Sequence, residues 1–392
     1  MKSVVIVGAS AAGLSTAEAL RREGFTGRIA LVDSDDHMPY DRPPLSKQYL
    51  LGAWPAEKLA LRSESAIGAL EADLYLGRTA RSLRLDSRTV VLDDGVELPF
   101  DDLVIATGVR PYLPENIAAK RVHTLRTLDD ASRLRTALSS ASRVAIVGAG
   151  FVGCEVAATC VSQGLDVELI DRSEAPLVGA IGTSLAHMIT ELHRSHGVCL
   201  HSGVGVLGID DVHGGPSELA LTDGSSVEAD VVIVGVGSVP NTEWLFGTGI
   251  GLGNGIECDA YSQAAPRVWG VGDVASWVSA RLARRVRVEH RLHAVEHAQH
   301  VARSIAHSRS TPFDPLPYFW SDQYDLRLQS FGHRAPAADL EVVAGSLDAR
   351  KFVARYVSEG VIVGVIGANM PKETRLASRE IGSPAELVTS SV

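Results

Sequence analysis

Two glycine-rich turns are the segments of this chain whose residue types and spacing could bind a phosphate-containing ligand. Residues 8–13 have the sequence GASAAG, and residues 148–153 have the sequence GAGFVG, a complete G-x-G-x-x-G pattern. Glycines in this pattern allow a tight turn and let backbone N–H groups approach a pyrophosphate closely. Ser10 replaces the usual second glycine, and we expect it to crowd that approach slightly. Two such turns predict two dinucleotide sites.

Each turn has the flanking elements that the pattern requires. The first lies in a predicted strand–turn–helix–strand unit over residues 3–33, and the second in a similar unit over residues 143–171. The strands are apolar and rich in β-branched residues, as is typical of buried parallel strands. Both units end in an acidic residue, Asp33 or Asp171, which can accept a hydrogen bond from a ribose hydroxyl.

Charged residues near the second turn indicate the type of dinucleotide. Asp171 suits a ribose 2′-OH and repels a 2′-phosphate, which favours NADH, whereas Arg172 beside it could accommodate the phosphate of NADPH. Glu155 lies in the first turn of the following predicted helix. An acidic side chain there suits the positive end of a helix dipole.

Three further apolar strands end in short motifs. Residues 103–108 close on Ala-Thr-Gly, residues 231–237 close on Gly-Val-Gly, and residues 267–273 close on Gly-Asp. The carboxylate of Asp273 could contact a sugar-like hydroxyl.

Together these features resemble the flavoproteins with two dinucleotide domains, in which FAD occupies the first turn and NAD(P) the second. The resemblance implies an α/β, glutathione-reductase-like fold: two Rossmann-like doubly wound domains and a C-terminal α+β domain. It places an FAD domain at residues 1–112 and 236–312, an inserted NAD domain at 113–235, and the C-terminal domain at 313–392. Asp273 would hold the ribityl chain of FAD.

Residues 39–47, PYDRPPLSK, are the most specific string in the chain. They resemble the bacterial ferredoxin reductases that serve Rieske oxygenases and cytochromes P450, together with rubredoxin reductase and apoptosis-inducing factor. By this resemblance Arg42 reaches the FAD phosphates, Lys47 lies beside flavin N5, and Glu155 pairs with Lys47 and orients the nicotinamide carboxamide. Trp320, in the string YFWSDQY at residues 318–324, would contact the flavin ring and also fits the opening strand of the C-terminal domain.

Lys47 and Glu155 are thus the predicted catalytic residues, and the remaining candidates form two ligand-binding sets. The FAD set is Gly8, Ser10, Ala11, Ala12, Gly13, Asp33, Ser34, Arg42, Lys47, Ala106, Thr107, Gly108, Arg110, Gly272, Asp273, His290, Arg291 and Trp320. The NAD set is Gly148, Gly150, Phe151, Val152, Gly153, Glu155, Asp171, Arg172, Gly235, Val236 and Gly237.

The segment 287–295 departs from many ferredoxin reductases. In the family it opens a helix whose N-terminus points at the flavin, where the reduced ring is anionic. Arg291 and His293 replace the Trp and Asn of many members, and the histidine-rich string is more similar to that of apoptosis-inducing factor. The departure leaves the flavin environment and the natural electron acceptor open.

Several classes of function are disfavoured by composition and spacing. A net charge of −10 argues against a nucleic-acid partner, and the apolar runs are too short to span a membrane, so we expect a cytoplasmic protein. The four cysteines form no C-x-x-C pair, and none precedes Cys154, which leaves disulfide reduction without a nucleophile and predicts no cysteine-based metal site. The histidines at 290, 293, 297 and 300 lack a recognisable metal-ligand pattern, and no G-x-S-x-G elbow supports hydrolysis.

The sequence is therefore interpreted as that of an FAD-dependent NADH:ferredoxin oxidoreductase. It would pass electrons from NADH through FAD to a separate [2Fe–2S] ferredoxin or a rubredoxin that supplies a P450 or Rieske oxygenase. The alternatives are an NADH oxidase or dehydrogenase with oxygen or quinone as acceptor, and a redox-sensing binding protein similar to apoptosis-inducing factor. Arg281, Arg284, Arg285 and Arg287 form a candidate docking patch for an acidic ferredoxin. A monomer and a homodimer are both compatible with the sequence.

Overall fold

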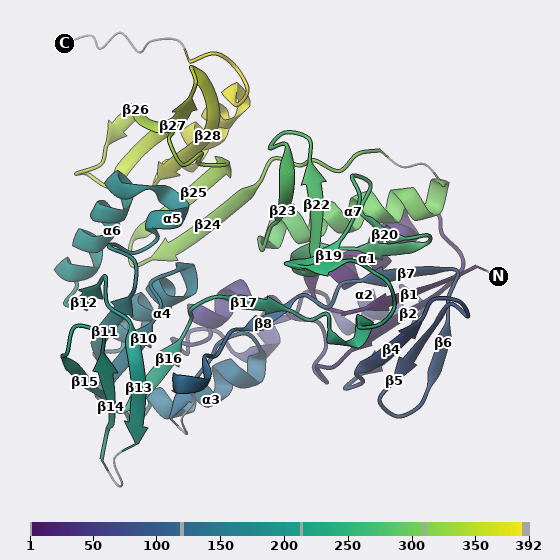
Figure 1. Cartoon of the computed structure of the whole chain (residues 1–392), viewed down its shortest axis with the longest axis horizontal. Coiled ribbons are helices and arrows are strands. Elements are labelled where there is room, and N and C mark those ends of the chain that lie inside the picture. Colours follow the sequence, from purple (N-terminus) through teal and green to yellow (C-terminus); the bar gives the residue numbers. More distant parts are fainter. Residues whose placement is uncertain (1, 118–120, 212–214, 309–310, 386–392) are drawn as a thin grey trace. The chain divides into compact units, whose positions relative to one another are not determined.

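The computed structural model describes residues 2–117, 121–211, 215–308 and 311–385, which form two compact units (Figure 1). The first unit consists of Met1–Asp41, Ala56–Arg110 and Ser238–Pro315, and the second of Arg42–Pro55, Pro111–Gly237 and Leu316–Val392. This division differs from the three domains expected from sequence, because the C-terminal residues and residues 42–55 pack with the central part of the chain. Leu50 is fully buried in the core of the second unit, and the hydroxyl of Tyr49 hydrogen-bonds to that of Ser132.

The first unit is built on a six-stranded sheet in the order β20-β21-β7-β1-β2-β3, in which the edge strand β20 runs antiparallel to β21. Its strands are β1 (Ser3–Val7), β2 (Arg28–Asp33), β3 (Ala72–Leu76), β7 (Asp102–Ile105), β20 (Gln263–Ala265) and β21 (Val268–Gly270). The smaller sheets contain β4 (Ala80–Arg84), β5 (Thr89–Leu92) and β6 (Glu97–Pro99); β8 (Val109–Pro111) and β17 (Ser238–Pro240); and β18 (Leu252–Gly253), β19 (Gly255–Glu257), β22 (Ala275–Ser279) and β23 (Arg284–Arg287). The helices are α1 (Ala11–Arg22), α2 (Glu64–Gly68) and α7 (Arg291–His307).

Both faces of this parallel sheet are covered, which explains the continuous apolar runs of its strands. On one face, Ile6 of β1 packs with Leu20 of α1 and Val301 of α7. On the other face, Val5 of β1 packs with Trp277 of β22. The two helices that pack together therefore come from opposite ends of the unit's sequence and begin at the same edge of the sheet (Figure 1).

The second unit contains a parallel five-stranded sheet in the order β12-β11-β10-β16-β9. Its strands are β9 (Val122–His123), β10 (Arg143–Val147), β11 (Asp166–Asp171), β12 (Cys199–Ser202) and β16 (Val231–Val234). An antiparallel three-stranded sheet contains β13 (Val206–Asp211), β14 (Ser217–Leu221) and β15 (Ser226–Ala229), and the C-terminal antiparallel sheet contains β24 (Tyr318–Gln323), β25 (Leu326–Gly332), β26 (Asp339–Ser346), β27 (Lys351–Ser358) and β28 (Val361–Ala368). The helices are α3 (Leu128–Leu138), α4 (Phe151–Ser162), α5 (Val178–Ile181), α6 (Thr183–Ser195) and α8 (Pro371–Ala377).

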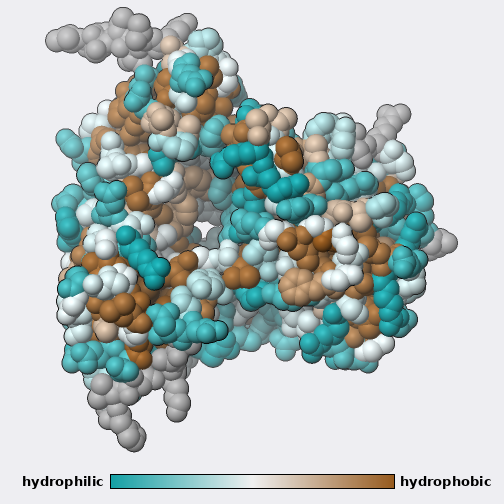
Figure 2. All heavy atoms as spheres, in the orientation of Figure 1, coloured by the Kyte–Doolittle hydropathy of each residue, from teal (hydrophilic) through white to brown (hydrophobic). Residues whose placement is uncertain are grey.

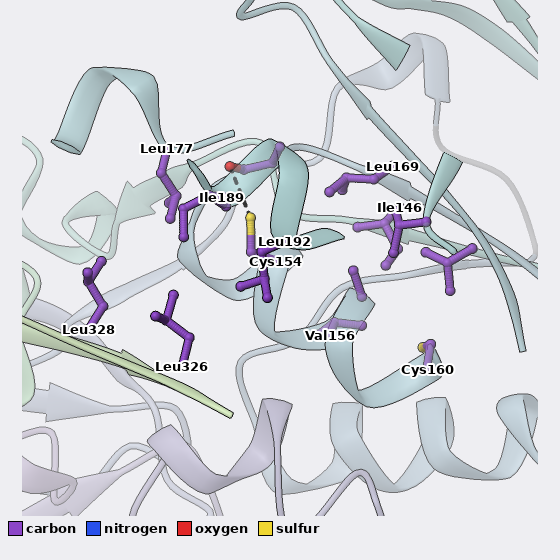
Figure 3. Close-up of a cluster of buried hydrophobic side chains, with 14 of the residues drawn as sticks. Ile146, Cys154, Val156, Cys160, Leu169, Leu177, Ile189, Leu192, Leu326 and Leu328 are labelled. Carbon is purple, nitrogen blue, oxygen red and sulfur yellow. Dashed lines mark hydrogen bonds between the residues drawn. The ribbon is translucent and has the colours of Figure 1, made fainter. Parts of the chain in front are cut away.

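One hydrophobic core joins the parallel sheet to the C-terminal sheet (Figure 3). Ile146 of β10 and Val156 of α4 belong to it, and so do Leu326 and Leu328 of β25. These side chains are almost completely buried, and burying a leucine is worth about 1.5–3 kcal/mol. The C-terminal sheet is thereby fixed against α4, the helix that follows the second glycine turn. Among the described residues, no helix is both long and apolar enough to cross a membrane.

Candidate functional site

The two glycine turns have the same local geometry. Gly8 and Gly148 have φ angles of +106° and +107°, a region that favours glycine. The N–H of Gly8 donates to the carbonyl of Val32, and that of Gly148 donates to the carbonyl of Ile170. A Cβ on either glycine would overlap the carbonyl group of the neighbouring strand end, at Ala106 or Gly235 respectively. Only glycine therefore fits the first position of each turn.

The last glycine of each turn allows the helix to approach the strand. A Cβ on Gly13 would overlap the carbonyl oxygen of Gly8, and one on Gly153 would overlap that of Gly148. Helices α1 and α4 begin after Ser10 and Gly150, and neither helix has a side-chain cap. Their first backbone N–H groups thus remain available to an anionic ligand, which the helix dipole also favours.

The second position of each turn borders open space. A Cβ on Gly150 would meet no protein atom within 4 Å. The equivalent side chain of Ser10 is therefore accommodated by the protein, and the crowding predicted from sequence can apply only to a ligand. The two turns fit pyrophosphate groups, because the protein leaves both space and backbone donors at the same point.

The acidic residues that end β2 and β11 point back to the turns. Asp33 accepts a hydrogen bond of 2.6 Å from the backbone N–H of Ala9, and Asp171 accepts one of 2.5 Å from that of Ala149. The other carboxylate oxygen of Asp171 accepts from the N–H of Ser173 at 2.7 Å. A carboxylate has acceptor capacity beyond two such bonds, so it can still bind a ribose hydroxyl. Arg172 lies against Gly205.

The Gly-Asp motif lies beside the first glycine turn, although some 260 residues separate them in sequence. Gly272 has a φ of +72°, and a Cβ there would come within 2.9 Å of the Cβ of Ala12. The backbone carbonyl of Asp273 accepts a hydrogen bond of 3.0 Å from Arg287. The structure thus brings together the parts of the FAD set that belong to the first unit: the turn, Asp33 and Asp273.

Helix α7 holds this motif through His297, one of the four histidines that lack a recognisable metal-ligand pattern in the sequence. The ring Nδ1 of His297 accepts a hydrogen bond of 3.2 Å from the N–H of Gly272, so Nε2 must carry the proton that bonds to the hydroxyl of Ser262 at 2.9 Å. Burial lowers the pKa of His297 well below its ordinary value. The neutral ring required by these two bonds is therefore the stable form.

Arg291 and His293, which depart from the pattern of many ferredoxin reductases, make protein contacts at the start of α7. Arg291 forms an ion pair of 2.5 Å with Asp41. His293 is 2% exposed and stacks on Trp277 at a centroid distance of 4.9 Å. Burial lowers its pKa to about 3, and neither ring nitrogen has a hydrogen-bond partner among the described residues. Burial also lowers the pKa of His290, the residue that precedes the helix.

Other members of the FAD set are held by protein contacts. The hydroxyl of Thr107 donates to the carbonyl of Asn241, whose side-chain amide donates back to the carbonyl of Thr107. The guanidinium of Arg110 bonds to Asn241 and Glu243. Arg42, Lys47 and Trp320 belong to the second unit.

Lys47 and Glu155, expected to form a pair, do so in the second unit. The ammonium of Lys47 lies 3.0 Å from a carboxylate oxygen of Glu155, and the two side chains are only 12% and 8% exposed. The hydroxyl of Ser46 donates to the same oxygen at 2.6 Å, and the hydroxyl of Ser321 donates to the other at 2.9 Å. The buried carboxylate therefore has a counter-ion and two neutral donors, as a buried charge requires.

A chain of hydrogen bonds leads from this carboxylate through the string SDQY to α6. The amide nitrogen of Gln323 donates to the hydroxyl of Ser321 at 3.1 Å, and its oxygen bonds to Nε2 of His193 at 3.0 Å. The other nitrogen of His193 lies 3.1 Å from the hydroxyl of Tyr324. Burial lowers the pKa of His193 to about 4, so the ring is neutral at neutral pH.

The residues of this hydrogen-bonded series could not be identified one by one from the sequence. The string SDQY was noted, but its partners Ser46 and His193 lie 275 and 128 residues away from Ser321 in the sequence, so no local pattern connects them. Trp320 lies in the same strand and stacks near Tyr318, while Phe319 contacts Phe151 of α4 at a centroid distance of 4.8 Å. This ring contact places β24 directly against the start of α4.

The cysteines offer no activated nucleophile. Cys154, Cys160 and Cys258 are buried, and burial raises the pKa of all three thiols, to about 12 for Cys160 and Cys258. Cys154 lies inside the core of the second unit, where its thiol meets the carbonyl of Ala149 (Figure 3). Cys199 is exposed and also has a raised pKa. A thiol with a raised pKa is a poor nucleophile at neutral pH.

Comparison with known proteins agrees with this architecture. Residues 2–300 match the family described as pyridine nucleotide-disulphide oxidoreductase, and residues 318–391 match a reductase C-terminal domain. Rhodocoxin reductase of Rhodococcus erythropolis is 34% identical, over 97% of this chain and 89% of that protein. The ferredoxin–NAD(+) reductase component of an anthranilate dioxygenase system of Burkholderia cepacia is also 34% identical, over 97% of this chain and 94% of its own length.

A solved structure shows the same fold. The covalent complex of putidaredoxin reductase with putidaredoxin contains a chain that is 33% identical, with a TM-score of 0.92 over 96% of this chain and 92% of that one. The α/β fold and the family predicted from sequence are thus confirmed. The chain belongs to the pyridine nucleotide-disulphide oxidoreductase family, within its group of ferredoxin reductases.

Proposed function

We propose that this chain is an FAD-dependent NADH:ferredoxin oxidoreductase that delivers electrons to the ferredoxin or rubredoxin of an oxygenase or P450 system. The observation that carries the proposal is the duplicated dinucleotide cradle, of which the second copy holds the buried pair of Lys47 and Glu155. The relatives support the choice of acceptor, since one is named as the reductase of a dioxygenase system and a second was solved in covalent complex with putidaredoxin. The raised pKa values of the thiols disfavour disulfide reduction.

The first unit would bind FAD. The N–H groups at the start of α1 fit its pyrophosphate, Asp33 fits the adenosine ribose, and Asp273 fits the ribityl chain. His297 would act through the backbone of Gly272, which it fixes against α1. When bound, FAD supplies the conversion between a two-electron donor and a one-electron acceptor.

The second unit would bind NADH. The N–H groups at the start of α4 fit the pyrophosphate, and Asp171 fits the 2′-OH of the ribose. Glu155 and Lys47 would orient the nicotinamide carboxamide, because the serine hydroxyls and the ion pair keep both side chains in one position. Such alignment is the main contribution that a protein makes to hydride transfer between cofactors.

The acceptor would be a separate iron–sulfur protein, since three of the four cysteines are buried, Cys199 alone is exposed, and a cluster needs several cysteine ligands. The docking surface would be the hairpin of β22 and β23, over which hydrophilic side chains gather (Figure 2). Two of the four arginines proposed from sequence bind other groups of the protein. Arg285 is an exposed residue whose guanidinium donates to the carbonyls of Cys258 and Ser276, and Arg287 pairs with Glu289. Arg281 and Arg284 are exposed and remain the docking candidates.

The FAD content of the purified protein tests whether the first unit binds this cofactor. The purified protein should be yellow and contain about one FAD per chain, and Gly272→Ala should lower FAD affinity because the new Cβ meets Ala12. Gly95→Ala is the matched control, since Gly95 also has a positive φ but no atom near its Cβ position. Flavin absorbance after equilibrium dialysis measures the FAD content of the wild type and the FAD affinity of each variant. A wild-type protein that fails to take up FAD would overturn the whole proposal.

The choice of nicotinamide tests the role of Asp171. NADH should reduce the bound flavin more efficiently than NADPH does, because the carboxylate accepts from a 2′-OH and repels a phosphate. Asp171→Ala should narrow this preference by about tenfold, corresponding to roughly 1.4 kcal/mol. Stopped-flow measurements of flavin reduction by NADH and by NADPH give the ratio of the two efficiencies. A preference of the wild-type enzyme for NADPH would show that Arg172 governs the choice instead.

The hydroxyl of Ser321 tests the positioning of Glu155. Ser321→Ala removes a hydrogen bond to a charged group, worth about 1.5–3 kcal/mol, and should slow flavin reduction at saturating NADH by about tenfold. The dissociation constant of NADH should change less, because the cradle around Asp171 is intact. Ser330→Ala, at another buried serine of the same sheet, is the control. An unchanged reduction rate in Ser321→Ala would refute this role.

Docking is tested by charge reversal at the two exposed arginines. The double variant Arg281→Glu and Arg284→Glu should raise the apparent KM for an acidic ferredoxin and weaken its dependence on salt. Reduction of ferricyanide, which needs no docking surface, should change little. The charge-matched control is Arg81→Glu with Arg88→Glu, both exposed in the hairpin of β4 and β5. Equal effects of the two double variants on the KM would place the ferredoxin site elsewhere.

A further inference from the structure

Two neighbouring strands of the second unit bring a thiol, an imidazole and a carboxylate together. Cys199 and His201 lie two residues apart on β12, the edge strand of the parallel sheet, and Glu168 lies directly opposite Cys199 on β11. Paired residues in adjacent strands share a face, as do residues two apart on one strand. The three side chains therefore point to the same side of the sheet.

The distances between the donor atoms fit a metal ion. Nε2 of His201 lies 2.7 Å from a carboxylate oxygen of Glu168 and 3.7 Å from the sulfur of Cys199, and all three donor atoms lie within 4.8 Å of one another. Zinc–sulfur and zinc–nitrogen bonds of about 2.3 and 2.0 Å place tetrahedral sulfur and nitrogen ligands roughly 3.5 Å apart. The imidazole and carboxylate would have to separate by only about 0.6 Å to reach zinc-ligand spacing.

We propose that Glu168, Cys199 and His201 form a binding site for Zn²⁺ or a similar thiophilic divalent cation, with water completing the coordination. None of these residues belongs to the sets assigned to FAD or NADH. The absence of cysteine pairs in the sequence predicted no such site, because that reasoning considers only spacing along the chain. Here the register of two parallel strands brings together residues that are 31 positions apart.

The chemistry of the donors selects the metal. Sulfur and imidazole ligands suit Zn²⁺, whereas Mg²⁺ and Ca²⁺ prefer oxygen ligands. A thiol binds a cation as the thiolate, so the cation must displace the thiol proton, which oxygen-preferring cations do poorly.

The site is accessible from solvent. Cys199 is exposed, while Glu168 and His201 are 32% and 23% exposed at their side chains. An ion could enter from solvent and would link the edge strand β12 to β11.

The experiment measures zinc binding to the FAD-loaded enzyme after removal of metal by a chelator. Equilibrium dialysis with metal analysis should give about one Zn²⁺ per chain. Zn²⁺ should also slow the reaction of the single exposed thiol with a disulfide reagent, whereas Mg²⁺ should not. Cys199→Ser and His201→Ala should each weaken zinc binding by at least tenfold, and Glu168→Gln should weaken it while keeping a hydrogen-bond partner for the imidazole.

His187→Ala is the matched control, because His187 is an exposed histidine of α6 in the same unit. Reduction of the flavin by NADH in each variant without zinc verifies that the protein remains folded. Zinc affinity that is equal in the wild type, Cys199→Ser and His201→Ala would overturn the proposal, as would a loss of affinity in His187→Ala of the same size. Saturation of the wild type by Mg²⁺ at similar concentrations would also overturn it.

Discussion

The buried carboxylate of Glu155 is the constraint on which the organisation of the second unit depends. An unpaired charge in a protein interior costs several kcal/mol, so the fold must bring donors to it. Lys47 and Ser46 come from the segment that precedes the parallel sheet, and Ser321 comes from the C-terminal sheet. These contacts, together with the apolar core around Leu50 and Leu326, explain why three stretches of sequence form one compact unit. The charge at the start of α4 thus determines how these segments pack.

The direction of the hydrogen bonds around this carboxylate is also determined. Glu155 can only accept, so Ser321 must donate to it and must itself accept from the amide of Gln323. The amide oxygen then requires a proton on Nε2 of His193, and the other ring nitrogen is left to accept from Tyr324. Burial holds His193 in the neutral form that this order needs. A single arrangement of protons satisfies the whole chain, which leaves the position of the carboxylate well defined.

The sequence was informative wherever the function depends on local spacing. The glycine turns, Asp33 and Asp171, and the pair of Lys47 and Glu155 all lie where their motifs and the family resemblance predicted. It was less informative where partners are distant: neither the bonds between Ser46 and Glu155 nor the tie of His297 to Gly272 has a local signal. The arginine cluster illustrates the same limit. Composition revealed the positive charge, but only the fold shows that the guanidinium of Arg285 bonds to backbone carbonyls, that Arg287 pairs with Glu289, and that Arg281 and Arg284 face solvent.

The two glycine turns share one backbone geometry, and they differ in single side chains next to it. Both turns need glycine for the same steric reason, and both acidic strand ends accept from the equivalent backbone N–H. Two residues beyond the last glycine, however, the first copy has Ser15 and the second has Glu155. In the second copy the acid is buried and paired with Lys47, so its charge has a fixed position. Under the proposed function this fixed charge would align the nicotinamide, a task for which the neutral Ser15 of the first copy offers no equivalent group.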